Sequence, residues 1–213
     1  MGYNFPEGSS QQFSQTFAAV KNITALTNAD PAVATCVGHG LTTGDEILLA
    51  IGWEDATDSV FKVTQLTADT FSIDGLDATD INFFPAGSGV GTFQKISNWV
   101  AMPQVLTIGT SGGDPNFTDV APLAKRNGIK IPTGFNATSI TLSLAHDATL
   151  ASYKTMVKIS RVLKKVAFKQ VLNGGAVTYG YGYMSVSEFP KLNSKQVNTV
   201  DAAMAFLGRS ISY

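Results

Sequence analysis

The chain has 213 residues and is rich in hydrophobic residues (44%), poor in charged residues (15%), with a mean hydropathy of +0.11. This composition excludes a highly charged disordered chain, and the length fits one large domain or two small ones. The net charge of −1 excludes a strongly basic or strongly acidic protein. Because soluble domains carry about 25% charged residues, the low charge favours a surface that copies of the chain cover.

A single cysteine, Cys36, excludes a disulfide framework and a zinc site built on thiolates. The first residues, MGYNFPEGSSQQFSQ, contain neither a basic start nor an apolar run, unlike a signal peptide. No apolar stretch approaches the roughly 20 residues that a membrane helix needs. We therefore expect synthesis in a cytoplasm and no membrane span.

Turn residues separate β-branched runs about every eight to twelve residues, which is typical of an all-β protein. A first series of expected strands lies within residues 32–38, 45–52, 60–66 and 70–77. Strand-like residues 17–26 and 93–100 flank this series. The arrangement predicts an inserted domain at 23–96 within a larger domain made of 1–22 and 97–213.

A second series of expected strands lies within residues 103–109, 136–147, 165–175, 176–189 and 197–208. Asn173-Gly174-Gly175 stands between two alternating runs and predicts a β-hairpin. In the run at 136–147, the hydroxyl residues Ser139, Thr141 and Ser143 share the face opposite Ile140, Leu142 and Leu144. This hydroxyl face either lines a wet channel or faces solvent.

One segment, residues 148–165, breaks the β pattern and predicts an α-helix with Asp147 or Thr149 as its N-cap. Its apolar stripe is Leu150, Tyr153, Val157 and Ile159 or Val162. Its basic residues share the opposite face at i, i+4, i+7 and i+11: Lys154, Lys158, Arg161 and Lys165. Three interpretations of this basic stripe are open: a solvated face, a contact with DNA phosphates, or docking on an acidic surface of a neighbouring copy.

Charge is unevenly distributed along the chain. Residues 30–80 contain ten acidic residues and one basic residue, a formal charge of −9. Residues 125–213 contain twelve basic residues and three acidic ones, a formal charge of +9. The two parts therefore attract each other, either within one molecule or between neighbouring copies.

Catalysis has no candidate residues, so no enzyme is expected: the chain contains no G-x-S-x-G motif and no Ser-His-acid cluster. His39 lies between glycines in a turn, where a histidine usually bonds the turn backbone. Asp74, Asp77 and Asp80 repeat every three residues, which differs from the spacing of a calcium loop and favours an Asp-rich turn. No cofactor or metal site is expected.

Tyr179, Tyr181 and Tyr183 alternate with Gly180 and Gly182, which places three rings on one face of a strand and bare backbone on the other. The bare face invites close approach by another layer. The rings form either a stacking platform for sugars or single-stranded nucleic acid, or a packing or subunit contact. The packing or contact interpretation is the commoner for such a strand.

Two parts of the second series resemble the tail tube (major tail) proteins of long, flexible-tailed, siphovirus-type bacteriophages. The first runs from WVAMPQVLTIG at 99–109 to the Pro-Thr-Gly-Phe turn at 132–135 and the strand ending in LAHD at 144–147. The second begins at VAFKQVLNGG, continues through FPK, and closes with LGRSISY at 207–213. Together they cover about half of the chain.

The first series is similar to a small β-barrel module of phage tail and baseplate proteins. The similarity rests on an HGLxxGD turn at 39–45 and on TADTFSIDG at 67–75, which matches the module's TxxTFxLDG hairpin except for one Leu. The resemblance implies a structural role for His39.

The resemblances imply a β-sandwich or barrel-forming tail tube fold with one flanking α-helix and an inserted small β-barrel domain. They imply hexameric rings that stack head to tail into a hollow tube, with the tape-measure protein and then phage DNA in the lumen, and terminator and tip proteins as partners. The implied location is the virion tail, after synthesis in the host bacterial cytoplasm. Because such lumens are electronegative, we expect Lys154, Lys158, Arg161 and Lys165 to face outward or toward another ring.

The segment 109–134 shows little periodicity, and we expect it to be an arm that reaches the adjacent ring. Subunit-interface candidates are the four basic residues and Tyr179, Tyr181 and Tyr183. The alternative function is a glycan- or receptor-binding β module of a phage tail tip or adhesin, which uses the tyrosine strand or the inserted barrel. A glycan-binding module predicts affinity in the isolated monomer, whereas a tube protein predicts self-association.

Overall fold

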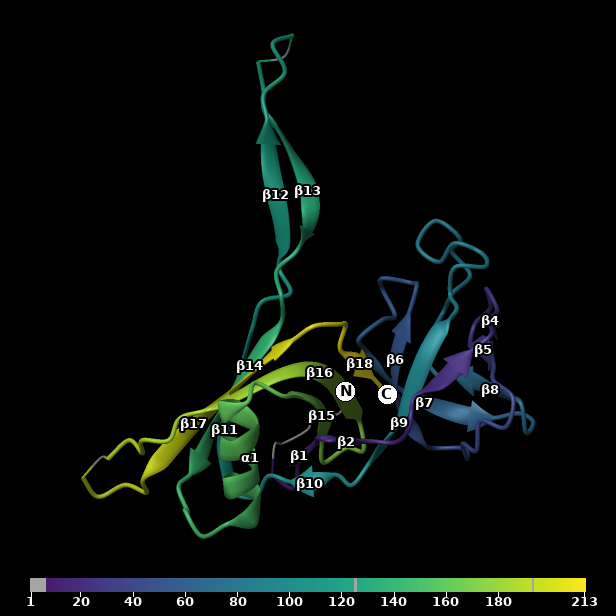
Figure 1. Ribbon diagram of the computed structural model, residues 1–213. Coiled ribbons are helices and arrows are strands. Elements are labelled where there is room, and N and C mark those ends of the chain that lie inside the picture. The colour runs from purple at the N-terminus through teal and green to yellow at the C-terminus, as the bar shows by residue number, and fades with distance from the viewer. Residues whose placement is uncertain (1–6, 125, 193) are drawn as a thin grey trace.

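The computed structural model describes residues 7–124, 126–192 and 194–213. Strands make up 47% of the described residues, and α1 (Ala151–Arg161) is the one helix among them. The prediction of a mainly β fold with a single flanking helix is therefore confirmed. Two large antiparallel sheets lie beside each other, and a long hairpin projects from the molecule (Figure 1).

The main sheet contains eight antiparallel strands. In sheet order they are β10 (Val100–Ala101), β1 (Ser10–Ser14), β15 (Lys165–Val171), β16 (Val177–Val186), β17 (Thr199–Phe206), β14 (Ser139–Ala145) and β11 (Val105–Ser111), with β18 (Ile211–Ser212) beside β16. Phe13 of β1 and Leu142 of β14 belong to the same buried core. Gln11 of β1 and Ile108 of β11 line one cleft of about 500 Å³. The main sheet is thus curled, with β1, its second strand, near β11, its last.

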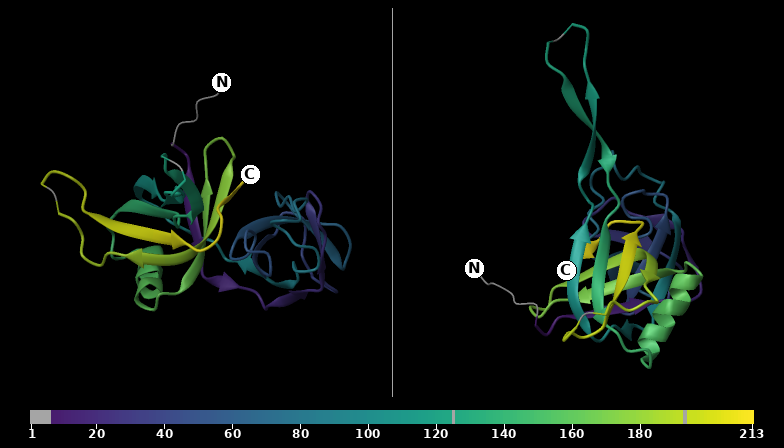
Figure 2. Two further views of the ribbon diagram at one scale, coloured as in Figure 1. Left: turned by 90° about the horizontal axis from the view of Figure 1, so that it is seen from above. Right: turned by 90° about the vertical axis from the view of Figure 1, so that its left-hand side faces the viewer.

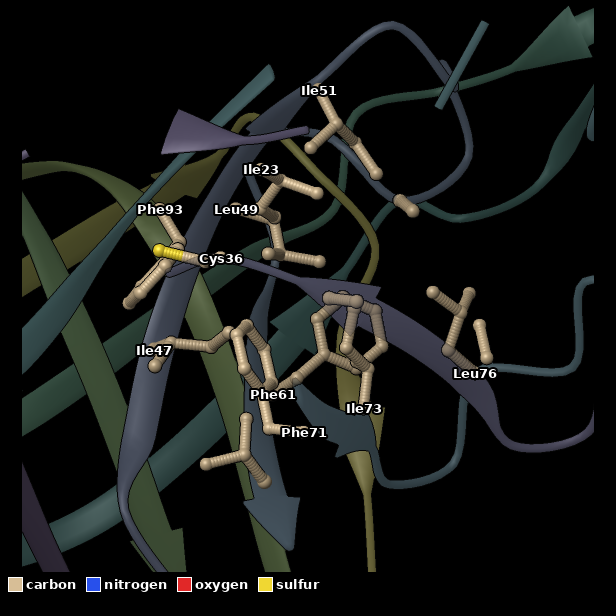
Figure 3. Packing of buried hydrophobic residues seen from close by; sticks show 14 of the residues in the cluster. Ile23, Cys36, Ile47, Leu49, Ile51, Phe61, Phe71, Ile73, Leu76 and Phe93 are labelled. Carbon is tan, nitrogen blue, oxygen red and sulfur yellow. The ribbon is translucent and has the colours of Figure 1, made fainter. Parts of the chain in front are cut away.

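The second sheet also contains eight strands. In sheet order they are β2 (Thr16–Phe17), β9 (Gly91–Ser97), β6 (Glu46–Ile51), β7 (Val60–Gln65), β8 (Thr70–Ile73), β5 (Ala32–Thr35) and β4 (Ala25–Leu26), with β3 (Lys21–Ile23) also beside β9. Since β3 pairs with β9 and continues directly into β4, which pairs with β5, the strands form a closed circuit. Phe61, Phe71 and Phe93 pack with aliphatic side chains inside this circuit (Figure 3).

The chain leaves the main sheet between Ser14 and Thr16 and returns to it between Ser97 and Val100. Residues 16–23 contain β2 and β3 and pair with β9, although the predicted boundary assigns residues 16–22 to the discontinuous domain. The second sheet therefore begins several residues before the predicted boundary at 23. The division into a domain at 23–96 and a discontinuous domain at 1–22 and 97–213 stays a prediction.

The helix is shorter than the predicted 148–165, and neither expected residue caps it. The Asp147 carboxylate accepts hydrogen bonds from the Thr149 N–H (2.8 Å) and hydroxyl (2.6 Å), so it forms a turn before the helix, whose N-cap is Leu150. Leu163 adopts a left-handed backbone with φ 49°, which ends the helix at Arg161. Lys165 therefore begins β15 and does not share a helical face with the other three basic residues.

The buried side of α1 also differs from the expected stripe in part. Met156 and Ile159 are buried in the core of the main sheet, and Tyr153 and Val157 pack against that core. Val162 lies beyond the helix end and is 71% exposed. The helix thus covers the core face of the main sheet and presents its lysines away from that core.

Residues 109–134 do not form an irregular loop. They include β12 (Pro115–Val120), which pairs with β13 (Ile129–Phe135) in a separate two-stranded sheet that we call the arm, residues 114–135. All residues of both strands are exposed, so no buried face imposes the alternation from which strands are predicted. The arm projects far from both large sheets in two perpendicular views (Figures 1 and 2).

Two glycines of β16 explain how the strand packs. The predicted hairpin at 173–175 is confirmed, since it joins β15 to β16 with Gly175 at φ 87°. A Cβ on Gly180 would lie 2.4 Å from the Phe206 ring, and a Cβ on Gly182 would lie 1.9 Å from the Ala205 carbonyl oxygen. The bare face of the strand therefore admits a close neighbour, but that neighbour is the adjacent strand β17 of the same sheet and not the other layer that the alternation predicts.

We expect Gly182→Ala to lower the free energy of unfolding by about 1–3 kcal/mol, because a backbone carbonyl occupies the space that the methyl group needs. Gly109→Ala in β11 is the matched control, since the nearest atom to its Cβ would be 4.0 Å away. Urea denaturation followed by circular dichroism measures both variants. Equal stabilities would show that the close approach at Gly182 is not a packing constraint.

Candidate assembly site

A largely buried carboxylate joins the two large sheets. Glu46, the first residue of β6, accepts a hydrogen bond from the Tyr179 hydroxyl (2.5 Å) and another from the Trp99 indole N–H. Lys169 of β15 forms an ion pair with the same carboxylate at 2.6 Å. Because Glu46 and Lys169 side chains are only 11% and 20% exposed, this pair is largely shielded from water. We call Glu46, Trp99, Lys169 and Tyr179 the junction.

Apolar packing surrounds the junction. Leu48 and Val60 of the second sheet pack against Ala167 and Tyr179 of the main sheet in one buried cluster. The Lys169 ammonium also lies 5.4 Å from the Trp99 ring centroid, within the range of a cation–π contact. The contacts fix how the second sheet sits on the β15–β16 side of the main sheet.

A second contact beside the junction involves Tyr213. Its hydroxyl accepts a hydrogen bond from the Lys62 N–H (3.0 Å) and donates one to the Asp74 carbonyl (2.7 Å). Burial raises the pKa of Tyr213 to about 12. Burial, followed by the hydrogen bond to Glu46, raises the pKa of Tyr179 as well. Both phenols therefore stay neutral at pH values where an exposed tyrosine ionises.

The tyrosine strand does not form a stacking platform. Tyr179 and Tyr181 are 1% and 9% exposed, and Tyr181 packs edge-on against Phe17 of β2. Tyr183 is 40% exposed, and the Lys165 ammonium lies 5.8 Å from its ring centroid. The packing interpretation is therefore correct for two of the three rings. Tyr183 alone lies at the surface, so the glycan-binding alternative loses two of its three stacking residues.

The basic candidates occupy two different places. Lys154, Lys158 and Arg161 are exposed on α1, whereas Lys165 lies in β15 beside the tyrosines. Arg161 forms a two-pronged ion pair with Glu188, with N–O distances of 2.8 and 2.6 Å. This hydrogen bonding lowers the pKa of Glu188. Lys154 and Lys158 are the basic residues of α1 that make no ion pair within the described ranges.

The outer side of three neighbouring strands carries small side chains. Register places the expected hydroxyl residues of β14 beside small residues of β11 and β17, all on the face opposite the core. We call this set the small-residue face: Thr107, Gly109, Ser111, Ser139, Thr141, Ser143, Asp201, Ala203 and Ala205. Its one charged member, Asp201, is paired with Lys191. The face therefore carries only small side chains and no unpaired charge.

The turn residues have local structural roles. His39 is buried, its Nδ1 accepts a hydrogen bond from the Leu41 N–H (2.9 Å), and its Nε2 contacts the Thr67 carbonyl oxygen (3.0 Å). The backbone-bonding interpretation of His39 is therefore correct. Asp77 and Asp80 accept hydrogen bonds from residues two positions later, as in an Asp-rich turn. Within the described ranges, no three His, Cys, Asp or Glu side chains lie close enough to hold a metal ion.

Sequence patterns did not single out the junction residues Glu46, Trp99 and Lys169, nor Tyr213. Glu46 is separated from Tyr179 by 133 positions and from Lys169 by 123, so no local spacing links them. One weak signal exists, since Glu46 opens a strand whose following residues are almost all apolar. No helix of the described residues has the length and hydrophobicity to cross a membrane.

Fold and surfaces together define a mainly β protein with an open sheet edge at β11, a projecting arm and a hydrogen-bonded junction between its sheets. The sequence model of the phage tail tube proteins (TTP) matches residues 51–213. The chain therefore belongs to the phage tail tube protein family, whose members are structural components of the virion tail. The match includes β7, β8 and β9 of the second sheet. No curated protein matches the chain.

We expect Glu46→Gln to lower the free energy of unfolding by about 2 kcal/mol, because the amide loses the ion pair and turns N–H groups toward buried donors. Glu188→Gln is the matched control, since it removes an exposed ion pair and should change stability little. Urea denaturation measures both. If the two variants lost equal stability, the junction would contribute no more than a surface contact.

Proposed function

We propose that the chain assembles into hexameric rings that stack head to tail as the tail tube of a siphovirus-type phage. The observation that carries this proposal is the open edge of the main sheet. β11 pairs with β14 on one side and with no described strand on the other. An exposed strand edge invites pairing with another chain, and closure into a ring removes it.

The small-residue face indicates which side of the main sheet lines the lumen of the proposed tube. The second sheet packs on β15 and β16, whereas β14 and β11 form the opposite wall of the curled main sheet. We propose that the small-residue face lines the channel and that the second sheet, as an inserted domain at 23–96, lies on the outside of the tube. A wall of short side chains whose one charged member, Asp201, is paired offers DNA phosphates no unpaired cation to bind, so DNA passes without sequence-specific binding.

The exposed lysines support a contact between copies. Lys154 and Lys158 lie on α1, which covers the core face and thus points away from the proposed channel. We propose that they dock, together with Arg161, on the acidic segment 30–80 of a neighbouring copy. Lys165 and Tyr183 lie together at the surface of β15 and β16 and form a second interface candidate.

Other parts of the role follow from the family. The proposed partners are the tape-measure protein, which occupies the lumen before ejection, and the terminator and tip proteins at the tube ends. The chain would be made in the cytoplasm of the host bacterium, would have no enzymatic activity and would need no cofactor. The arm is proposed to reach the adjacent ring.

We expect the purified chain to form rings and hollow tubes in negative-stain electron micrographs as its concentration rises. Lys158→Glu should raise the concentration at which tubes appear without unfolding the monomer, and the effect should weaken with added salt. Lys195→Glu, also exposed and outside α1, is the control. A chain that stays monomeric at every concentration and binds glycans would contradict the tube proposal and favour the alternative function.

We expect Thr141→Cys to react with a maleimide carried on a bulky polymer in the monomer but not in the assembled tube, because the polymer cannot enter the channel. Ala86→Cys, exposed in the loop between β8 and β9, should react in both states. The native Cys36 is buried and should stay unreactive. Labelling of both sites in intact tubes would place the small-residue face outside the lumen.

A further inference from the structure

A groove of about 690 Å³ lies where the arm, the main sheet and the second sheet meet. The groove is lined by Gly113 and residues 134–138 at the arm base, by residues 206–210 from the end of β17 onward, and by Glu54 and Asp55 from the turn after β6. Phe135, Phe206 and other apolar residues form part of the lining, so the groove combines an apolar surface with an acidic rim. A volume of this size suits a few side chains of a slender segment.

The acidic rim is only partly neutralised. Asp55 forms an ion pair with Arg209 at 3.0 Å, across the two sheets. Glu54 is exposed and makes no ion pair within the described ranges. The rim thus retains a free carboxylate that favours a basic partner.

The far end of the arm has the complementary chemistry. Between Val120 and Lys130 the sequence contains two basic residues and no acidic one. Leu123 is fully exposed, and Arg126 makes no ion pair within the described ranges. We call residues 121–128, which join β12 to β13, the arm tip.

The arm itself presents an uncovered apolar surface. Register places Thr118 opposite Ile131 and Val120 opposite Ile129, so these four residues share one face. Each is exposed to solvent. A two-stranded hairpin with no packed face is marginally stable in water, so this face is suited to a partner that covers it.

We propose that the groove receives the arm tip of a second copy of the chain. This inference rests on the proposed tube assembly and names the receiving site for the arm. The tip cannot enter its own groove, because β12 alone extends about 20 Å from the groove at the arm base. Each molecule therefore offers one tip and one groove at opposite ends of the arm. Such a contact is heterologous and repeats from copy to copy along a filament.

A cysteine cross-link tests the contact directly. In Leu123→Cys/Ser210→Cys, one cysteine is in the arm tip and the other is at the exposed lining of the groove. Mild oxidation of assembled protein should give a ladder of covalent species, each one chain longer than the last. Either cysteine alone should give at most dimers. Leu123→Cys/Lys195→Cys, which moves the second cysteine to the exposed connection between β16 and β17, should give no ladder.

A charge exchange tests the same contact without cysteines. Glu54→Arg and Arg126→Glu should each raise the concentration needed for tubes at least about tenfold, and the double variant should restore assembly. Circular dichroism verifies that each variant folds. The contact alone would be overturned if tubes formed but neither Ser210→Cys nor a second groove position, Ala137→Cys, gave a ladder with Leu123→Cys, and if the double charge variant did not restore assembly. If the unmodified chain formed no tubes, the proposed function would fail and this contact with it.

Discussion

The arrangement of the molecule depends on one carboxylate. The Glu46 side chain extends from the second sheet and accepts hydrogen bonds from the Tyr179 hydroxyl, the Trp99 indole N–H and the Lys169 ammonium. These three groups belong to the main sheet or to the connection that leads to it. A charge this far from water is costly unless its partners satisfy it, and removal of one partner leaves the others uncompensated. The four side chains therefore hold one another in a single arrangement. Since apolar residues pack around them, the two sheets are held as a unit and not as two bodies on a linker.

Because the junction fixes the second sheet on β15 and β16, the two sides of the curled main sheet are covered differently. The wall at β15 and β16 is covered by the second sheet, and the core face is covered by α1. The outer surface of β11, β14 and β17 is left bare, and the only charge on it is already paired. The groove also depends on the junction, because Glu54 and Asp55 reach the arm base only when the second sheet is held in this position. A shift of the junction would therefore change both the groove and the direction in which the bare wall faces.

Features that arise from local geometry could be predicted from the sequence. Alternation in β14, the Asn-Gly-Gly hairpin, the turn role of His39 and the mainly β class all follow from residues close together in the chain. The junction could not be predicted, since its partners lie more than a hundred positions apart. The helix end was misplaced because one left-handed residue, Leu163, overrides a continuing apolar period. The strands of the arm could not be predicted, because a hairpin that is exposed on both faces does not require alternating apolar and polar residues.

The uneven charge of the chain acts partly within the molecule. Lys169 and Arg209, from the basic part, pair with Glu46 and Asp55, from the acidic part, and both pairs join the two sheets. The intramolecular attraction that the sequence left open therefore accounts for two of the acidic residues. Other charges of both signs stay exposed, among them Glu54 on the groove and Lys154 and Lys158 on α1. Because the pairs inside the molecule fix where the remaining charges lie, the same asymmetry that joins the sheets also orients the surfaces that we propose to join the copies.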